Sequence, residues 1–350
     1  MSLNKFKKIE APPLLFEDLY PEKPFLKGIA KLADESPLAL EQNQVDYYSL
    51  PYRSVLNWCQ GTRMSDVWTI NPYRGCEFGC VYCYARYTHE FMELWDWRDF
   101  ERKIFIKENP AEILRKELEK GKGRDSSIVI GSATDPYQPA ERWAKSTRQI
   151  LEVLSDYSGL DITIITKSIL PTRDMDIMKR ISGKSNIEIH ETITTTDMNL
   201  ARIIEPRAPT PHARLRTVKT LVENEIVAGV HIMPILPGIT DKLEMLENLF
   251  KEVAETKAHF IVTQPVFLRP CSIKRYYPFL EEYFPHLLKA YERVYSKSSE
   301  APSEYHEKIK KLVDELRTKY PIESRRPPKH IHNPDMEEEK LPLFAEMSQA

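Results

Sequence analysis

Six short segments of the chain are apolar at consecutive positions, and stretches with apolar residues at helical spacing separate them. The apolar segments are rich in isoleucine and valine, which is typical of strands that are covered on both faces of a parallel sheet. The pattern therefore predicts six strands, at residues 67–70, 127–132, 161–166, 186–193, 226–235 and 259–267.

Start signals for helices occur between these segments. Asn109 and Thr210 are each followed by proline, and Asp241 precedes Glu244 at the spacing of a capping box. A capping side chain, a proline at the first helical position and an early glutamate all satisfy or tolerate the free N–H groups of a helix start. Repetition of strand, helix and strand predicts a parallel sheet with right-handed crossovers.

Such a sheet can be a closed barrel, a partial barrel or a doubly wound sheet. All three place ligand sites at the carboxyl ends of the strands. The unusual polar loops of this chain lie at those ends, for example "ATDPYQPAE", "TTTD" and "PGITD". We therefore expect the functional site at this edge of the sheet.

The two ends of the chain lack this regular pattern. Residues 1–60 are dotted with proline and predict an irregular N-terminal extension. Residues 61–270 form the expected core, residues 271–320 a helical C-terminal region, and residues 321–350 a charged, loosely ordered tail.

Composition indicates a globular protein, because 41% of residues are hydrophobic and 29% are charged. The net charge of -2 excludes a uniformly basic surface, so any nucleic-acid binding would need a local patch. No apolar segment is long enough to span a membrane and no leader is evident, so we expect a cytoplasmic location without a membrane partner. Thiols stay reduced there, and clustered cysteines then indicate metal or redox chemistry.

Three of the five cysteines lie in the stretch "NPYRGCEFGCVYCYARYTHEF", as Cys76, Cys80 and Cys83. A structural zinc site and an electron-transfer cluster both take four ligands. A fourth ligand would have to be His89, Cys59 or Cys271, and neither a second C-x-x-C pair nor a paired histidine follows.

Three close thiolates instead suit a [4Fe–4S] cube in which the fourth iron is open to another ligand. Gly75 and Gly79 would allow the loop to fold tightly around such a cube and to direct amides at its sulfurs. Three buried, inert cysteines are the plainer alternative.

The C-x3-C-x2-C spacing, with Tyr82 just before the last cysteine, resembles the signature of the radical S-adenosylmethionine (radical SAM) superfamily. The stretches "NPYRGCEFGCVYCYAR", "TDPYQPAE", "EPRAPTP" and "PILPGITD" together resemble the branch related to spore photoproduct lyase, often labelled DNA repair photolyase-like. The resemblance implies an α/β fold with a partial (β/α)6 TIM-like barrel, which agrees with the six predicted strands.

The resemblance implies that Cys76, Cys80 and Cys83 ligate the cluster and that S-adenosylmethionine (SAM) binds the open iron. An electron from a donor such as ferredoxin or flavodoxin then cleaves SAM to a 5′-deoxyadenosyl radical, which abstracts a hydrogen atom from the substrate. The cofactor supplies this lyase-like chemistry, while the protein supplies placement and exclusion of water.

The resemblance also implies contacts to SAM from residues at the ends of the strands. These residues are Tyr82, Thr134, Asp135, Lys167, Thr194, Thr195 and Pro234. Each has a plainer alternative: core packing for the aromatic ring, an Asp-Pro turn for the Thr-Asp pair, and a solvated strand end for the lysine and the threonines.

Other polar and aromatic residues favour structural roles. Glu205 with Arg214 or Arg207 predicts a buried ion pair that braces a loop, with phosphate binding by the arginines as the alternative. His190 and His231 lie inside predicted strands and are typical of satisfied core histidines. The tryptophans Trp95, Trp97 and Trp143 favour packing over base stacking.

The chain departs from the repair enzymes at one position. Spore photoproduct lyases carry a hydrogen-donor cysteine on the loop after the second strand, and residues 131–141 of this chain contain none. Tyr137 and Cys271 are the candidate substitutes. Efficient repair of a thymine dimer is therefore not expected.

By family analogy the substrate is a nucleic-acid lesion or a modified nucleotide. A non-catalytic iron–sulfur or zinc protein, with a structural or electron-transfer site, is the alternative class.

Overall fold

The computed structural model describes residues 26–42, 44–60 and 64–324. Its centre is a seven-stranded sheet in the order β11-β10-β9-β8-β7-β4-β3. Six strands run parallel and follow chain order, which confirms all six predicted strands: β4 (Ser65–Ile70), β7 (Ile128–Ile130), β8 (Asp161–Thr166), β9 (Asn186–Thr192), β10 (Val227–Ile235) and β11 (Ile261–Pro265). The seventh strand, β3 (Leu56–Gln60), pairs antiparallel with β4 at one edge.

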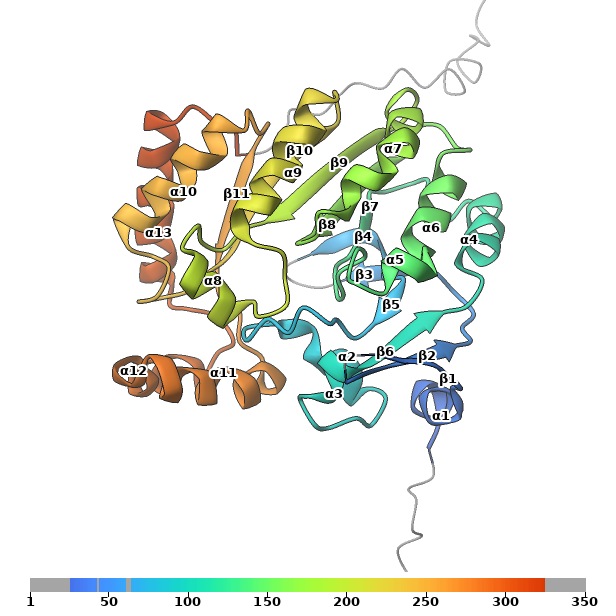
Figure 1. Ribbon diagram of the computed structural model, residues 1–350, viewed down its shortest axis with the longest axis horizontal. Helices are drawn as coiled ribbons and strands as arrows, with labels where there is room; N and C mark the ends of the chain where they lie inside the picture. The colour runs from blue at the N-terminus through green and yellow to red at the C-terminus, as the bar shows by residue number, and fades with distance from the viewer. Residues whose placement is uncertain (1–25, 43, 61–63, 325–350) are drawn as a thin grey trace, which may run out of the picture.

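Helices cover the outer face of this sheet and give the molecule the form of a partial barrel (Figure 1). Ile162, Ile164 and Ile189 point from alternate strand positions into the core beneath the helices and are fully buried. The covering helices are α4 (Pro110–Glu119), α6 (Ser146–Leu154), α7 (Met175–Ser182), α9 (Pro211–Glu223), α10 (Leu243–Glu255) and α13 (Ser303–Lys319).

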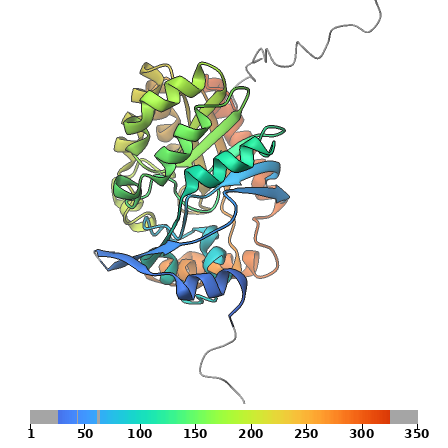
Figure 2. The same cartoon turned by 90° about the vertical axis from the view of Figure 1, so that its right-hand side faces the viewer.

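A second layer lies across one end of the barrel, below it in Figures 1 and 2. It contains a four-stranded sheet in the order β1-β2-β6-β5 and several helices. The elements are α1 (Gly28–Glu35), β1 (Leu38–Gln42), β2 (Val45–Leu50), β5 (Tyr73–Arg74), α2 (Tyr87–Glu90), α3 (Asp99–Arg102), β6 (Lys103–Lys107), α11 (Pro270–Tyr283) and α12 (Pro285–Tyr295). Because β5 comes directly after β4 and α11 directly after β11, this lower layer faces the carboxyl ends of the parallel strands.

The described part of the N-terminal extension differs from the irregular structure that the sequence predicted. Residues 28–60 form one helix and three strands, and β3 belongs to the main sheet. The reason is long-range pairing: Tyr48 of β2 lies opposite Phe105 of β6, more than fifty positions away, and no local pattern reports such a partner. Residues 1–25 of the extension and 325–350 of the tail lie outside the described residues.

One of the three predicted helix caps is confirmed. The hydroxyl of Thr210 accepts the N–H of Ala213 at 3.3 Å, as an N-cap does. Asn109 precedes α4 with a positive φ of 49° and no capping bond from its side chain. Asp241 accepts the N–H of Gly238 at 2.9 Å instead of capping α10.

Three helices, α11, α12 and α13, occupy most of residues 270–319. No helix among the described residues is long and apolar enough to cross a membrane.

Candidate functional site

The three clustered cysteines lie on one loop between the barrel and the lower layer. Cys76 and Cys80 are 9% and 7% exposed, and Cys83 is partly buried. Backbone hydrogen bonds tie the loop to both layers, since the N–H of Cys76 donates to Phe100 at 2.9 Å and that of Val81 to Ile204 at 3.0 Å. The thiols are therefore held within a fixed, largely dry environment.

Glycine is required where this loop turns. Gly75 and Gly79 have φ values of +83° and +66°, which side-chain-bearing residues rarely adopt. A Cβ at Gly79 would lie 2.8 Å from the guanidinium of Arg207 and 2.9 Å from the carboxylate of Glu101. The loop thus passes close to an ion pair and leaves no room for a side chain there.

The chemistry of the three thiols fits an iron–sulfur cluster. Burial raises the pKa of all three thiols, that of Cys80 to about 12, while the positive charge of Lys167 opposes the shift at Cys80 and Cys83. Buried thiols of this kind ionise when a metal replaces their protons. Among the described residues no group of three His, Cys, Asp or Glu side chains converges on one metal ion. Three thiols on one loop would suit a cube, in which each sulfur binds a different iron, better than a structural zinc ion, which takes four protein ligands.

Neither nearby candidate for a fourth ligand joins the three thiols. His89 turns its Nε2 to the carbonyl of Lys103 at 3.0 Å and packs its ring on Phe100. The Cys271 thiol lies 3.7 Å from the carbonyl of Tyr84, to which it donates. Within the described residues both candidates are therefore bound to backbone carbonyls, and the residues that would hold a cluster are the three cysteines of the loop.

A buried polar network lies on the barrel side of the cysteine loop. The Tyr82 hydroxyl donates to Glu205, and the Thr194 hydroxyl donates to the same carboxylate at 3.0 Å. Arg214 binds the other oxygen of Glu205, and both side chains are about 1% exposed. The predicted acid–arginine pair is thereby confirmed as a brace, and Arg207 instead pairs with Glu101 at 2.7 Å.

Lys167 points from the end of β8 toward this network. Its ammonium nitrogen lies 5.6 Å from the centroid of the Tyr82 ring. Burial lowers the pKa of Lys167, but the charges of Cys80 and Glu205 raise it and the net shift is upward. Among the described residues the ammonium has no hydrogen-bond partner. Its positive charge is therefore available to bind an anionic group of a ligand.

Thr134 and Asp135 are bound within the chain. The Thr134 hydroxyl donates to Gly75 at 2.6 Å and so anchors the cysteine loop. The Asp135 carboxylate accepts the hydroxyl of Thr166 at 2.8 Å and the N–H of Lys167 at 2.7 Å. This geometry favours the turn-bracing alternative for both residues over contact with a ligand.

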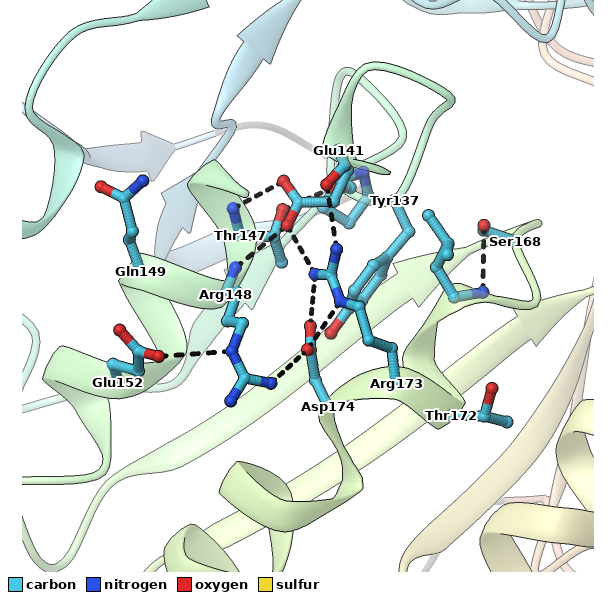
Figure 3. A network of polar contacts seen from close by, with 12 residues as sticks. Tyr137, Glu141, Thr147, Arg148, Gln149, Glu152, Ser168, Thr172, Arg173 and Asp174 are labelled. Atoms are coloured by element: carbon cyan, nitrogen blue, oxygen red, sulfur yellow. Dashed lines mark hydrogen bonds and ion pairs between the residues drawn. The ribbon is translucent and has the colours of Figure 1, made fainter. Parts of the chain in front are cut away.

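The remaining predicted residues lie near the same edge of the sheet. The Thr195 hydroxyl accepts the N–H of Asp197 at 3.1 Å, so the hydroxyl proton of Thr195 can still be donated to another group. Pro234 is buried near the end of β10. Tyr137 is fully buried, and its ring lies 6.0 Å from the guanidinium of Arg173 in a separate network (Figure 3).

Sequence reasoning missed Arg86, which touches the cysteine loop from the lower layer. Its guanidinium donates to the carbonyl of Cys80 at 3.0 Å, to that of Trp97 at 2.8 Å, and to Glu101. The only signal in the sequence was an arginine three positions after Cys83. That position alone does not predict which groups the guanidinium contacts.

Comparison with known families and proteins agrees with this site. Residues 70–252 match the family model described as the radical SAM superfamily. An uncharacterized protein of Methanocaldococcus jannaschii is 31% identical over 71% of this chain and 84% of its own length. An uncharacterized protein of Mycobacterium tuberculosis is 30% identical over 72% of this chain and 74% of its own.

Solved structures of similar fold include spore photoproduct lyase. Its complex with dinucleoside spore photoproduct superposes with a TM-score of 0.57 at 12% identity, over 78% of this chain and 79% of the lyase. A mutant with bound AdoMet and the same dinucleoside gives the same TM-score and coverage. At this identity the likeness establishes the shared fold.

Proposed function

Since the chain belongs to the radical SAM superfamily, we propose that it holds a [4Fe–4S] cluster on Cys76, Cys80 and Cys83 and reductively cleaves SAM to a 5′-deoxyadenosyl radical. As a radical SAM enzyme it uses SAM and an iron–sulfur cluster, and it takes its electron from a donor such as ferredoxin or flavodoxin. The observation that supports the cube is one glycine-shaped loop with three thiols, two buried and one partly buried, while His89 and Cys271 are bound to backbone carbonyls.

The bound cluster supplies the electron that breaks the sulfonium bond of SAM. The chain's own residues bind and orient the cofactor. Lys167, with a free ammonium beside the thiols, would bind the carboxylate of SAM. Tyr82 would present its ring to the adenosine, because Glu205 fixes its hydroxyl. The burial of the loop excludes water from a reactive radical.

Thr194 and Thr195 would stand on the ribose side of SAM, with Pro234 shaping the neighbouring strand end. Thr134 and Asp135 would act through the loops that they brace, not through direct contact. The substrate follows by family analogy: a nucleic-acid lesion or a modified nucleotide.

Of the two candidate hydrogen donors, the geometry favours Cys271 over Tyr137. Cys271 lies beside the residue that follows Cys83, whereas the Tyr137 ring is enclosed with Arg173 on the outer side of the barrel. An alcohol O–H gives up hydrogen poorly, so Ser132 does not replace the missing thiol.

Anaerobic reconstitution tests the proposal. The chain should hold about four irons, the content of one cube. Its reduced EPR signal should shift when SAM is added, and 5′-deoxyadenosine should form with dithionite. One zinc per chain, or an EPR spectrum that does not change when SAM is added, would instead indicate the structural or electron-transfer alternative.

A second assay addresses the substrate. With a thymine spore dimer, 5′-deoxyadenosine should form while the dimer stays largely unrepaired, because cleavage of SAM needs only the cluster and an electron. Multiple-turnover conversion to two thymines would show that a donor thiol or phenol acts after all.

A further inference from the structure

Two histidines contact each other on the inner face of the barrel sheet, which is turned away from the covering helices. Ile189, the neighbour of His190, belongs to the core beneath the helices. So do Val230 and Ile232, which flank His231. Because side chains alternate along a strand, both imidazoles point to the opposite face. They are 9% and 8% exposed, and the sequence favoured satisfied core histidines at both positions.

A chain of hydrogen bonds links the two imidazoles to a carboxylate. Nε2 of His190 contacts Glu188 at 2.7 Å, and Nδ1 of His190 contacts Nε2 of His231. The hydroxyl of Thr163 donates to the same oxygen of Glu188 at 3.1 Å. Within residues 26–42, 44–60 and 64–324, Nδ1 of His231 has no hydrogen-bond partner. The structure therefore satisfies His190 fully, whereas the chain of contacts ends at a free nitrogen of His231.

These contacts determine where the ring protons lie. A carboxylate accepts hydrogen bonds, so Nε2 of His190 carries a proton and donates it to Glu188. Burial lowers the pKa of His231 well below its usual value, and the charges of His190 and Lys167 lower it further, so this ring is neutral. In the neutral pair, Nδ1 of His190 accepts the N–H of Nε2 of His231. Nδ1 of His231 is then left as a base.

The two ends of this chain lie at different heights in the sheet. Glu188 lies in the amino-terminal half of β9, and its side chain is 25% exposed. His231 lies opposite Thr192, the last residue of β9. Lys167, whose charge acts on His231, directly follows β8. The chain thus runs from a carboxylate that water can reach to the edge of the sheet where SAM would bind.

Phe260, which directly precedes β11, packs against this chain. The centroid of its ring lies 4.5 Å from that of His190. A Cβ at Gly229, the partner of His190 on β10, would lie 2.3 Å from the Phe260 ring. Only glycine therefore lets the ring lie across β10 against the imidazole. The packing holds His190 in one orientation between its two hydrogen-bond partners.

We propose that Glu188, His190 and His231 form a proton relay, with His231 as the base that takes a proton from the substrate. The inference rests on the proposed function. When a carbon loses a hydrogen atom to the 5′-deoxyadenosyl radical, an O–H or N–H group on that carbon becomes far more acidic. The relay thereby indicates the substrate class: a compound in which such a group adjoins the reacting C–H bond.

The relay moves one proton from the substrate to water. The O–H or N–H bond of the substrate breaks as Nδ1 of His231 gains the proton. Nε2 of His231 passes its own proton to Nδ1 of His190, and Nε2 of His190 passes its proton to Glu188. Glu188 then releases a proton to solvent. No electron moves along the relay, and the unpaired electron stays on the substrate.

Nitrogen NMR of the full chain, labelled at its histidines, tests the proton positions. At pH 7 both rings should be neutral with the proton on Nε2, as the chain of contacts requires. His190→Gln and His231→Gln assign the signals. A charged His231, or a neutral His231 with its proton on Nδ1, would overturn the relay because no base would remain at its inner end.

Glu188→Gln distinguishes a relay from a structural hydrogen bond. The glutamine carbonyl can still accept the N–H of His190, but it cannot take up a proton. Exchange of the two ring N–H protons with water at pH 7 should therefore slow about tenfold. The melting temperature should stay within about 2 °C. Glu244→Gln, an exposed glutamate on α10, is the matched control and should change neither property. An unchanged exchange rate in Glu188→Gln would overturn the relay.

Addition of SAM to the reconstituted chain tests whether the inner end faces the reaction. The carboxylate of SAM would offset the charge of Lys167 that acts on His231, so the ring signals of His231 should shift. His259, an exposed ring that contacts Ala228 at the other end of β10, should not shift.

The outcomes with SAM separate this inference from the proposed function. If calorimetry shows that SAM binds while the signals of His231 stay unchanged, His231 is not the base and only the inference fails. If the reconstituted chain binds no SAM, the proposed function fails, and the role of His231 in the reaction fails with it.

Discussion

Two polar clusters lie beside the loop that follows β7, and they differ in how many of their charged and polar groups have partners within the protein. In the outer cluster, Arg173 bridges two fully buried carboxylates, those of Glu141 and Asp174, at 2.8 and 2.7 Å (Figure 3). Arg148 adds a bond to Asp174 at 2.8 Å, and the N–H of Thr147 donates to Glu141 at 2.8 Å. Each charge is matched inside the protein.

The cysteine site is not matched in this way. In the described part of the chain no side chain forms a hydrogen bond or an ion pair with the three thiols, and the Lys167 ammonium, 5.6 Å from the Tyr82 ring, has no hydrogen-bond partner. Buried polar groups are normally satisfied, and those that are not require an explanation. The contrast teaches that burial and ion pairing alone do not mark a functional site, whereas clustered polar groups without partners do.

Loss of a cysteine should have the largest effect and sharpen this contrast. Cys80→Ala should reduce iron from about four per chain to less than one and abolish 5′-deoxyadenosine formation, because the cube would lose one of its three protein ligands. Iron analysis and a SAM-cleavage assay measure this. Cys59→Ala, on a thiol bonded to the carbonyl of Met64, should retain both properties. Full iron in Cys80→Ala would assign the cluster elsewhere.

The outer cluster should respond in stability and not in iron. Arg173→Ala would leave two buried carboxylates with fewer partners, which predicts a loss of roughly 3–5 kcal/mol in the free energy of unfolding. Urea unfolding of the cluster-free chain measures it. Arg180→Ala, an exposed arginine on α7, should cost less than about 0.5 kcal/mol. Normal stability with lost SAM cleavage would give the outer cluster a catalytic role.

Removal of the free ammonium should affect the cofactor alone. Lys167→Ala should weaken SAM binding by about 10–100-fold, which corresponds to one charge-assisted hydrogen bond of roughly 1.5–3 kcal/mol. Thr194→Ala should act in the same direction. Equilibrium binding to the reconstituted protein, with iron content as the control, checks both. Unchanged affinity would return Lys167 to the role of a solvated strand end.

Lys107 tests whether every unpaired buried cation marks a site. It is 7% exposed, its nitrogen lies 4.9 Å from the Tyr52 ring, and burial together with Arg74 lowers its pKa to about 7. Below pH 7 both the folded and unfolded states carry the proton, so the cost of the buried charge is fully present. Between pH 7 and 10.5 only the unfolded state keeps it, and stability rises with pH.

Lys107→Met should therefore be more stable than the wild type at pH 6, by roughly 1–2 kcal/mol after the lost contact with Tyr52 is counted. The difference should shrink toward pH 9. Urea unfolding at both pH values measures it. A variant that is less stable at pH 6 would show that an anion holds Lys107, and the cation would then resemble Lys167.

The smallest effect is expected at Tyr137. Its hydroxyl is buried without a hydrogen bond of good geometry, so Tyr137→Phe removes a group that costs desolvation and gains little. Stability should change by less than about 1 kcal/mol, and product formation from any substrate should persist. A variant that forms 5′-deoxyadenosine but no product would identify Tyr137 as the hydrogen donor.

The sequence alone determined the parallel sheet and the cysteine loop. Six strands were predictable because buried parallel strands are apolar on both faces, a property that each segment carries by itself. Cys76, Cys80 and Cys83 lie within eight positions of one another, so local spacing reports their proximity. The pair of Glu205 and Arg214 was also within reach, since nine positions separate the two residues.

Only the tertiary structure decided what depends on distant partners. The lower-layer sheet forms because β2 pairs with β6. Asp135 braces a turn because its carboxylate accepts the N–H of Lys167, which directly follows the next strand, β8. Likewise, Trp97 and Arg275 lie 178 positions apart, yet the Arg275 guanidinium lies 4.9 Å from the centroid of the Trp97 ring. A residue type fixes the chemistry available to a side chain, but the partners that satisfy it, and those that are missing, are set by where the fold places the rest of the chain.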